Sequence, residues 1–515
     1  MKKPPVSYPL DEPKNTHPTV FRSAAVLIIV FVVLSLVFRE QALGAFGDTK
    51  NFLTDKIGWF FLLSTNFFLL ICLLVICTRR GNIRLGGQDA KPAYPFATWM
   101  AMLFSAGMGI GLVFWSVAEP ILHFTDPPLD GIDAGSQAAA KLAQTTTFFH
   151  WGLHAWGIYA LMGMALAYCA YNRGLPLTIR STLEPLLGKH TDGPAGNVVD
   201  VIASVATLFG VATSLGFGVQ QVNAGLAYVF GLPENSLMQT LLIAIITLFA
   251  TISVVSGLDT GIRRLSEANM LLAVLLLLFV LIFGPTLMQL TGLLDNTVAY
   301  LARFPGLSVW FGQGAPTHDW QQGWTIFYWA WWISWSPFVG MFIARISRGR
   351  TLRQFTIGVL LVPTVLTFLW LSVFGNAGLD EALAGNDQFV NLVGENKAKA
   401  LFGLLDQYPA AWLTSILGLV VIILFFVTSS DSGSLVIDII TAGGHPEPPT
   451  AQRIFWAVTE GLVAAVLLLV GGEQALTALQ TASVLTGLPF ALVLIVIAIS
   501  LLKQTRKPRP EPRAP

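Results

Sequence analysis

Long apolar stretches with few charges constrain this chain more than any other feature. Only 11% of its 515 residues are Asp, Glu, Lys or Arg, and 54% are hydrophobic. Soluble domains carry about 25% charged residues, and a helix crosses the hydrocarbon layer in about 20 apolar residues. The pattern therefore predicts an all-α integral membrane protein. The expected spans are twelve: 22–39, 58–78, 98–118, 146–170, 198–222, 238–257, 269–290, 324–344, 356–377, 409–440, 453–471 and 476–502.

The charge balance and the cysteines exclude several classes of protein. A net charge of +1 gives no overall field that attracts nucleic acid, so we expect no such partner. The three cysteines all lie in apolar runs, which argues against a disulfide scaffold and a Cys-based zinc site. We predict no attached soluble domain and no cofactor.

The distribution of Lys and Arg predicts the orientation. With the N-terminus in the cytoplasm, the cytoplasmic segments hold 23 of the 30 Lys and Arg residues. Positive loops favour that side, so both termini are predicted to be cytoplasmic. The expected organisation is an N-terminal tail (1–21), two peripheral spans (22–78), a first five-span half (98–290), an outside segment (291–323), a second five-span half (324–502) and a short tail (503–515).

Two spans contain residues that disturb helices. In span 3, Gly107, Gly109 and Gly111 follow at a spacing of two, and in span 8 the stretch 334–340 contains Ser-Trp-Ser-Pro and a glycine. Irregular backbone at membrane depth is tolerated only beside protein or a water-filled cavity. Paired interruptions in corresponding spans indicate a transporter binding site. The two breaks lie in the first span of each five-span half, spans 3–7 and spans 8–12. Because five is an odd number, the two halves enter the membrane from opposite sides, which predicts inverted repeats.

Aromatic residues gather at mid-depth in spans 4 and 8. At 1.5 Å per residue, Trp335 lies about 16 Å below Trp324, deeper than an interface anchor. Ring faces attract cations, above all quaternary ammonium groups, and backbone N–H groups at the glycine break suit a carboxylate. The sequence predicts a betaine-like ligand in a box of Trp151, Trp156, Tyr159, Trp331, Trp332 and Trp335.

Ionisable groups within the spans give weaker signals. Glu119 precedes Pro120 near the outer end of span 3, and we interpret it as a local structural cap. His150 and His154 have a spacing that suits metal ligands, but the sequence shows no third ligand, so no metal site is predicted there.

These stretches resemble the betaine/choline/carnitine transporter family. The similarity is carried by residues 107–120 (GMGIGLVFWSVAEP), 149–159 (FHWGLHAWGIY) and 324–340 (WTIFYWAWWISWSPFVG), and it extends through all twelve spans. The resemblance implies a LeuT-type core of two inverted five-helix repeats preceded by two extra helices. It also implies homotrimers, contact with membrane lipid, and a multi-pass location in a bacterial inner membrane.

The resemblance also implies site residues. The substrate would contact Gly107, Met108, Gly109 and the six residues of the aromatic box. A sodium ion would be held near Ser105, Met108, Phe425, Thr428 and Ser429, because hydroxyl and carbonyl oxygens suit a small hard cation. For a second sodium ion, relatives use two hydroxyls one turn apart. Here Thr207 supplies the first, and Val211 has no oxygen at the second, which argues against that site.

The prediction is a sodium symporter that imports a quaternary-ammonium osmoprotectant, glycine betaine first, by alternating access. Proton-coupled choline uptake and carnitine/butyrobetaine exchange remain alternatives, and a sulfonium solute or ectoine also suits an aromatic cage. An integral-membrane enzyme is the alternative of another class, but the sequence shows no catalytic constellation. A channel needs a continuous polar path, whereas this site is aromatic and closed.

Overall fold

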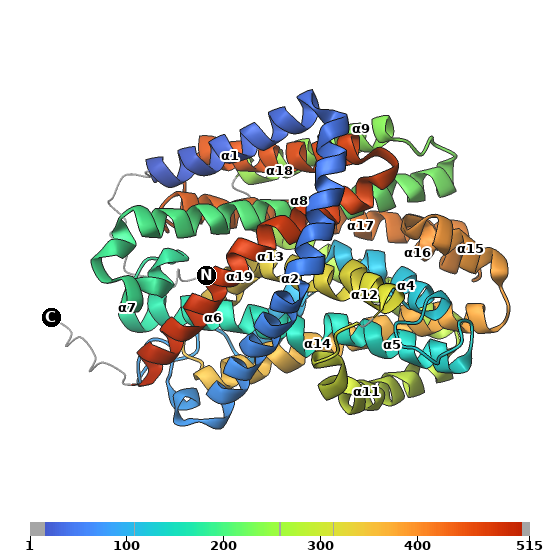
Figure 1. Cartoon of the computed structure of the whole chain (residues 1–515), viewed down its shortest axis with the longest axis horizontal. Helices are drawn as coiled ribbons and strands as arrows, with labels where there is room; N and C mark the ends of the chain where they lie inside the picture. Colours follow the sequence, from blue (N-terminus) through green and yellow to red (C-terminus); the bar gives the residue numbers. More distant parts are fainter. Residues whose placement is uncertain (1–15, 108, 257–258, 313, 507–515) are drawn as a thin grey trace.

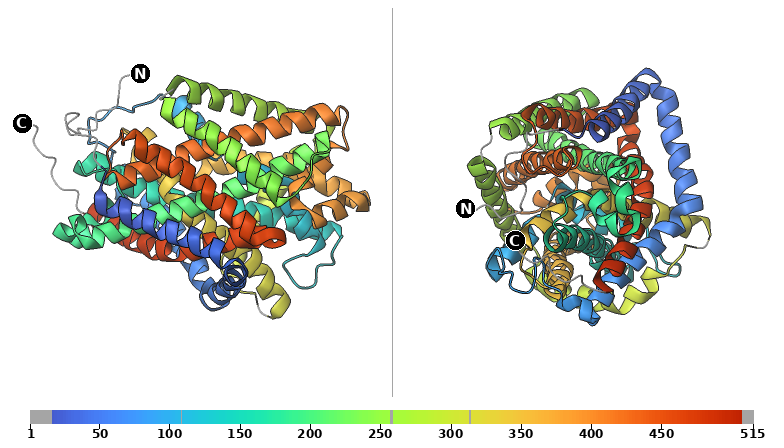
Figure 2. Two further views of the ribbon diagram at one scale, coloured as in Figure 1. Left: turned by 90° about the horizontal axis from the view of Figure 1, so that it is seen from above. Right: turned by 90° about the vertical axis from the view of Figure 1, so that its left-hand side faces the viewer.

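The computed structural model describes residues 16–107, 109–256, 259–312 and 314–506. Within these ranges every regular element is helical, apart from one isolated bridge between Arg84 and Thr351. Most helices run along the long axis of the molecule (Figures 1 and 2). A helix pairs its own backbone N–H and C=O groups. A chain inside a membrane requires this pairing, because no water is there to bind these groups. The predicted all-α fold is confirmed.

The first part of the chain has two peripheral helices and then the elements of the predicted first half. The peripheral helices are α1 (Pro18–Val37) and α2 (Arg39–Cys77). The first half contains α3 (Phe96–Gly107), α4 (Ile110–Thr125), α5 (Gln137–Trp151), α6 (Leu153–Arg173), α8 (Pro194–Phe230), α9 (Ser236–Ser256) and α10 (Asp259–Phe283).

The second half and the connections complete the chain. The second half contains α13 (Phe327–Ile346), α14 (Leu352–Leu383), α17 (Ala411–Thr441), α18 (Thr450–Gly471) and α19 (Ala475–Arg506). Connecting α-helices are α7 (Glu184–Leu187), α11 (Thr286–Ser308), α12 (Ala315–Gln321), α15 (Asp387–Glu395) and α16 (Ala400–Leu405). Short 3₁₀ turns cover Arg79–Asn82, Arg180–Leu183, Gly188–Asp192, Lys397–Lys399 and Gly472–Gln474, and a π-helical turn, Gln322–Ile326, leads into α13.

Ten helices among the described residues are long and apolar enough to cross a membrane. They correspond to ten of the twelve predicted spans. The other two are span 3, which is divided between α3 and α4, and span 8, which is α13. These two spans carry the glycine cluster and the tryptophans. Neither is among the ten qualifying helices, so the number of twelve spans stays a prediction. The segment 291–323, predicted as an outside connection, is largely helical because α11 fills much of it.

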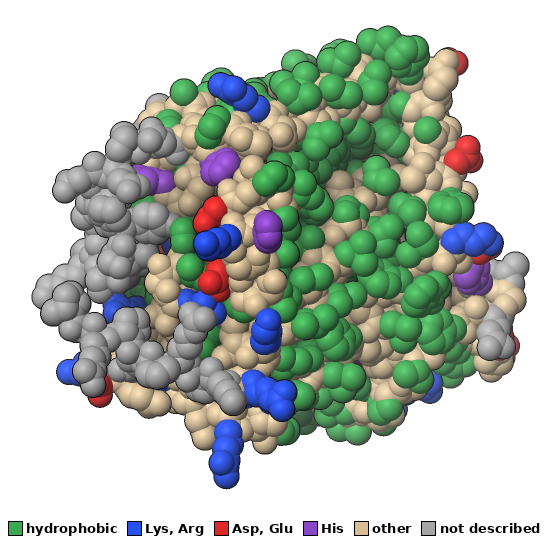
Figure 3. All heavy atoms as spheres, turned by 60° about the vertical axis from the view of Figure 1, so that its left-hand side comes forward, with side chains coloured by type: hydrophobic (Ala, Val, Ile, Leu, Met, Phe, Trp, Pro, Cys, Tyr) green, Lys and Arg blue, Asp and Glu red, His purple; other side chains and the backbone are tan. Residues whose placement is uncertain are grey.

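Helix α13 lies at the centre of the packing. It contacts α6, α8 and α19, and α4 packs against α14, α5 and α8. The site-bearing helices are therefore enclosed by others, whereas α1, α9, α10 and α11 expose many large apolar side chains. Figure 3 shows a broad band of hydrophobic side chains, with charged groups gathered at its two ends. Such a belt is the surface expected against lipid.

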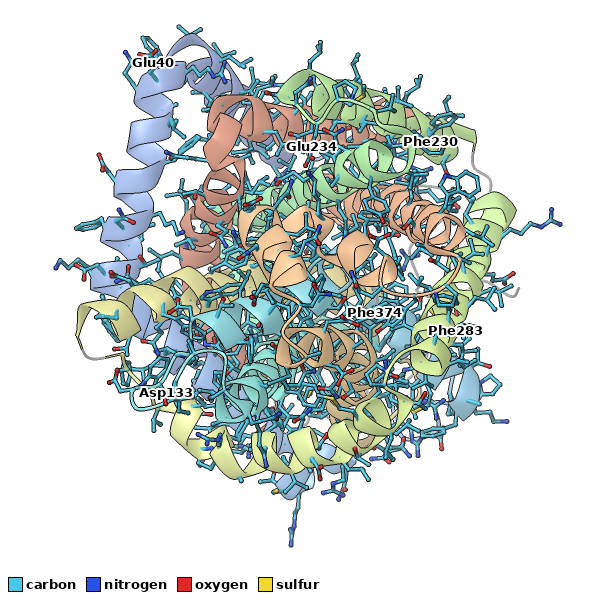
Figure 4. The ribbon with its side chains drawn as sticks, turned by 90° about the vertical axis from the view of Figure 1, so that its right-hand side faces the viewer. Glu40, Asp133, Phe230, Glu234, Phe283 and Phe374 are labelled. Carbon is cyan, nitrogen blue, oxygen red and sulfur yellow. The ribbon has the colours of Figure 1, made fainter. Side chains whose placement is uncertain are left out.

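The first and last described helices meet at one end of the molecule. Helix α1 begins and α19 ends at the same end of the molecule (Figures 1 and 2). Figure 4 looks at the molecule from the opposite side, with Glu40, Asp133 and Glu234 among the labelled residues. These three residues come from segments predicted to lie outside the cell. Which side of the membrane each loop faces stays a prediction.

Candidate functional site

The glycine stretch of span 3 leaves helical geometry, as predicted. Helix α3 ends at Gly107 and α4 begins at Ile110, while Gly109 is extended, with φ −164° and ψ 178°. Met108 lies outside the described residues. The break directs the N-terminal end of α4 towards a cavity that Gly109 and Gly111 line.

A second break, which the sequence analysis missed, divides span 4. Helix α5 ends at Trp151, Gly152 leaves helical geometry, and α6 begins at Leu153. The freed backbone N–H of Leu153 donates to the hydroxyl of Tyr300 at 3.1 Å. The only sequence signal for this break was Gly152 itself, which lies between two turns rich in aromatic residues and histidine. The break lets Trp151 and Trp156 project from two separately directed helices.

The predicted break in span 8 is wrong. Helix α13 continues through Ser334, Pro337 and Gly340. Proline has no N–H, so the carbonyl of Ile333 loses its partner one turn later. The hydroxyl of Ser336 donates to that carbonyl at 2.7 Å and replaces the missing bond. The irregular backbone lies instead in the π-helical turn before α13.

All six predicted box residues line one cavity. Trp151, at the end of α5, and Trp156 and Tyr159, on α6, face the tryptophans of α13 across it. The cavity has a volume of about 40 Å³. The remaining lining residues come from α4, α6, α8, α13 and α14 and include Leu112, Ala155, Ser214, Val339 and Thr367.

The rings form a connected cluster. Trp331 and Trp332 are stacked, with ring centroids 4.7 Å apart and planes 16° apart. Trp151 stands edge-on to Trp332 at 4.9 Å, and Tyr159 is 5.4 Å from Trp156. Edge-to-face and stacked pairs at these distances are favourable. The cluster thus holds several ring faces in fixed orientations around the cavity.

Hydrogen bonds fix some of the polar ends of these rings and leave others unpaired. The indole N–H of Trp332 donates to the carbonyl of His150 at 3.0 Å, and that of Trp331 to the carbonyl of Gly210 at 3.4 Å. Trp335 Nε1 and the Tyr159 hydroxyl are buried without a partner among the described residues. Buried donors usually have a partner, so these two suit an acceptor brought by a ligand.

Gly111 is required by the packing of the box. A Cβ at this position would lie 2.4 Å from Cη2 of Trp331, closer than any real contact. The absent side chain lets α13 present Trp331 directly against α4. This approach places the glycine break and the aromatic box on one cavity.

The described residues of the predicted sodium site lie on two helices, α3 and α17. Thr428 donates its hydroxyl to the carbonyl of Leu424 at 2.9 Å, which leaves its oxygen lone pairs free for a cation. Thr428 and Ser429 are half-buried on α17, which packs against α4 and α13. Phe425 is buried one turn away on the same helix. Ser105 is exposed on α3.

The second-site residue has an ordinary structural environment. Thr207 is buried on α8 and donates its hydroxyl to the carbonyl of Ala203 at 2.8 Å. Val211, one turn along, packs beside Gly433.

The interpretation of Glu119 as a cap is wrong. Helix α4 continues to Thr125, so Glu119 lies inside it and is fully buried. Its carboxylate contacts His123 and His150, and these three residues are grouped closely enough to resemble metal ligands. His154 lies apart, with Nε2 at 2.9 Å from the amide oxygen of Asn66. Sequence spacing could reveal only the pair of Glu119 and His123 on α4, because His150 comes from a separate helix, α5.

Comparison with known proteins identifies the family. The model of the betaine/carnitine/choline family transporters matches residues 19–510. The glycine betaine/proline/choline transporter of Vibrio parahaemolyticus is 47% identical over 504 residues, which cover 95% of this chain and 90% of that protein. The glycine betaine transporter OpuD of Bacillus subtilis is 45% identical over 465 residues, or 90% of each chain.

Among solved structures, the manganese transporter of Eremococcus coleocola is 12% identical, with a TM-score of 0.44, and the match covers 82% of this chain and 90% of that one. The family match and the close relatives extend over nearly the whole chain, and they are transporters, not enzymes. On this evidence the chain belongs to the betaine/carnitine/choline transporter family.

Proposed function

We propose that this protein imports glycine betaine together with sodium across the bacterial inner membrane. The observation that carries the substrate assignment is the convergence of six aromatic side chains on one cavity beside a broken helix. A quaternary ammonium group has no N–H and needs no acceptor, so an aromatic cage suits it. Relatives named for glycine betaine transport support the same substrate class.

The polar groups of the cavity suit the other end of a betaine. Trp335 Nε1 and the Tyr159 hydroxyl are donors without partners among the described residues. The N-terminal end of α4 begins at the cavity wall and favours negative charge. A zwitterion with a methylated cation and a carboxylate uses both features. Choline has a methylated cation but no carboxylate, so these polar groups favour glycine betaine over choline.

Sodium is the proposed coupling ion, with alternating access as the transport mode. Thr428 and Ser429 on α17 supply hydroxyl oxygens, and α17 packs against α4. An ion bound there and at the carbonyls before the break joins α17 to the end of α3. That link orders the cavity wall, so sodium binding favours substrate binding. A rocking motion then opens the loaded cavity to the cytoplasm.

Equilibrium binding tests the substrate assignment. Glycine betaine titrated into the purified protein in sodium buffer is expected to change tryptophan fluorescence with saturation. Trp335→Leu removes one ring and one donor, so the dissociation constant should rise about tenfold or more. Trp412→Leu, at an exposed position on α17, is the matched control and should bind like wild type. Equal weakening in both variants, or no saturable change in wild type, contradicts the assignment.

A further inference from the structure

The carboxylate of Glu119 is surrounded by donors from two other helices and from its own. Its Oε1 lies 2.6 Å from Nδ1 of His150 and 3.2 Å from Nε2 of His123. Its Oε2 accepts the indole N–H of Trp151 at 2.9 Å and the hydroxyl of Tyr328. Four groups thus point at two oxygens in a fully buried position.

This arrangement fits an ionised carboxylate. The indole N–H can only donate, and each histidine can donate through the nitrogen that faces Glu119. The far nitrogen of His150 lies 3.0 Å from the Thr325 hydroxyl, which fixes that ring. A buried charge persists only when such hydrogen bonds replace its water.

The same distances favour hydrogen bonding over metal binding. Ligand atoms at a zinc ion each lie about 2.0–2.2 Å from the metal, which holds them more than 3 Å apart. The 2.6 Å between His150 and Glu119 is the length of a charge-assisted hydrogen bond.

The group is joined directly to the aromatic box. Trp151, held by Glu119, stands 4.9 Å from Trp332. Tyr328, also held by Glu119, is stacked beside Trp332 at 5.7 Å. The backbone carbonyl of His150 accepts the N–H of Trp332. These three contacts, which fix Trp332 on this side, all come from residues bound to Glu119.

We propose that Glu119 is a positioning residue and the fixed counter-charge of the cation cage. Its carboxylate holds Trp151 and Tyr328 in place, and its negative charge, set behind the rings in a low-dielectric region, favours a cationic head group over an uncharged one of equal shape. This inference rests on the proposed function. The charge of Glu119 adds to the preference for cations that the rings already give, because ring faces also attract uncharged apolar groups.

Competition between two ligands of equal shape tests the charge effect. The probes are glycine betaine and 3,3-dimethylbutanoate, in which carbon replaces the ammonium nitrogen. Glu119→Gln keeps the side-chain size and removes the charge. It should weaken glycine betaine binding by about tenfold or more, with little change in dimethylbutanoate binding. Glu40→Gln, at an exposed site on α2, is the control for loss of one acid.

Two outcomes overturn the proposal. Equal weakening of both ligands in Glu119→Gln shows a purely structural role, and unchanged binding of both shows no role. If wild type binds no glycine betaine, the proposed function fails, and that failure is visible before any variant is measured.

A second pair of variants tests the positioning role and covers the case in which Glu119→Gln does not fold. Trp151→Phe and Tyr328→Phe each keep an aromatic ring and remove the one donor that bonds to Glu119. Each should weaken glycine betaine binding severalfold. Where Glu119→Gln folds, combining it with Trp151→Phe should be less than additive, because both remove one interaction. Wild-type affinity in both phenylalanine variants overturns the positioning role.

Discussion

At the scale of residues, the cavity depends on close contacts between backbone and rings. Gly111 on α4 leaves room for Trp331, and the carbonyls of Gly210 and His150 hold two indole groups. Each contact sets the direction of a ring face. Because cation–π attraction depends on the cation lying over the face, small displacements matter more here than in an ordinary apolar core.

Gly111→Ala should impair the site without removing any ring. The new Cβ would meet Trp331 at 2.4 Å, so the ring must move. We expect glycine betaine affinity to fall about tenfold or more, because overpacking of this kind typically costs about 1–3 kcal/mol. Gly306→Ala, on α11 with open space around it, is the control and should leave binding unchanged. Wild-type affinity in Gly111→Ala would show that the ring position is not critical.

Thr428→Ala tests the proposed sodium ligand. Loss of its oxygen should raise the sodium concentration needed for half-maximal uptake about tenfold, whereas Thr428→Ser, which keeps a hydroxyl, should stay near wild type. Thr414→Ala, on the same helix with its hydroxyl bonded to the Ala410 carbonyl, is the control. An unchanged sodium dependence in Thr428→Ala rules out this residue as a ligand.

The box residues could be predicted from the sequence because their tryptophans lie deep in the membrane. Most membrane tryptophans lie at the interface, so a deep group indicates another role. The sequence does not show which groups hold these rings. Glu119 bonds to Trp151 and Tyr328, which lie 32 and 209 positions away. Such pairs exist only once α4, α5 and α13 are packed. The role of Glu119 was therefore misread from its position before Pro120.

At the scale of elements, breaks in the helices decide where the site forms. The break after Gly107 was predicted because glycines at a spacing of two do not suit helix packing. The break at Gly152 was missed because one glycine in an apolar run is common in membrane helices. The break expected at Pro337 is absent because a neighbouring serine replaces the lost hydrogen bond.

Ser336→Ala tests this account of α13. Removal of the hydroxyl leaves the buried Ile333 carbonyl without its partner, which should cost about 1–3 kcal/mol in the free energy of unfolding. A lower melting temperature in detergent is the expected result. Ser372→Ala is the matched control, because that buried hydroxyl has no partner among the described residues. Equal stability of the two variants would contradict the role of Ser336.

At the scale of the whole molecule, the architecture follows from composition. Sparse charge predicted an apolar belt, and the charged side chains gather at the ends (Figure 3). The Lys and Arg distribution predicted the alternation of loops, and α1 begins where α19 ends, at one end of the molecule (Figure 2). Trimer formation and lipid contact stay predictions, because they concern surfaces between separate molecules. The exposed apolar faces of α9 and α10 suit either partner.

The central claim concerns coupling between sodium and a quaternary ammonium solute. Its most direct test is uptake of labelled glycine betaine into liposomes that contain the purified transporter. An inward sodium gradient should drive accumulation above the outside concentration, and replacing sodium by potassium should abolish it. A pH gradient or preloaded carnitine, applied in the same vesicles, separates proton coupling from exchange. Equal uptake in sodium and potassium would contradict sodium symport.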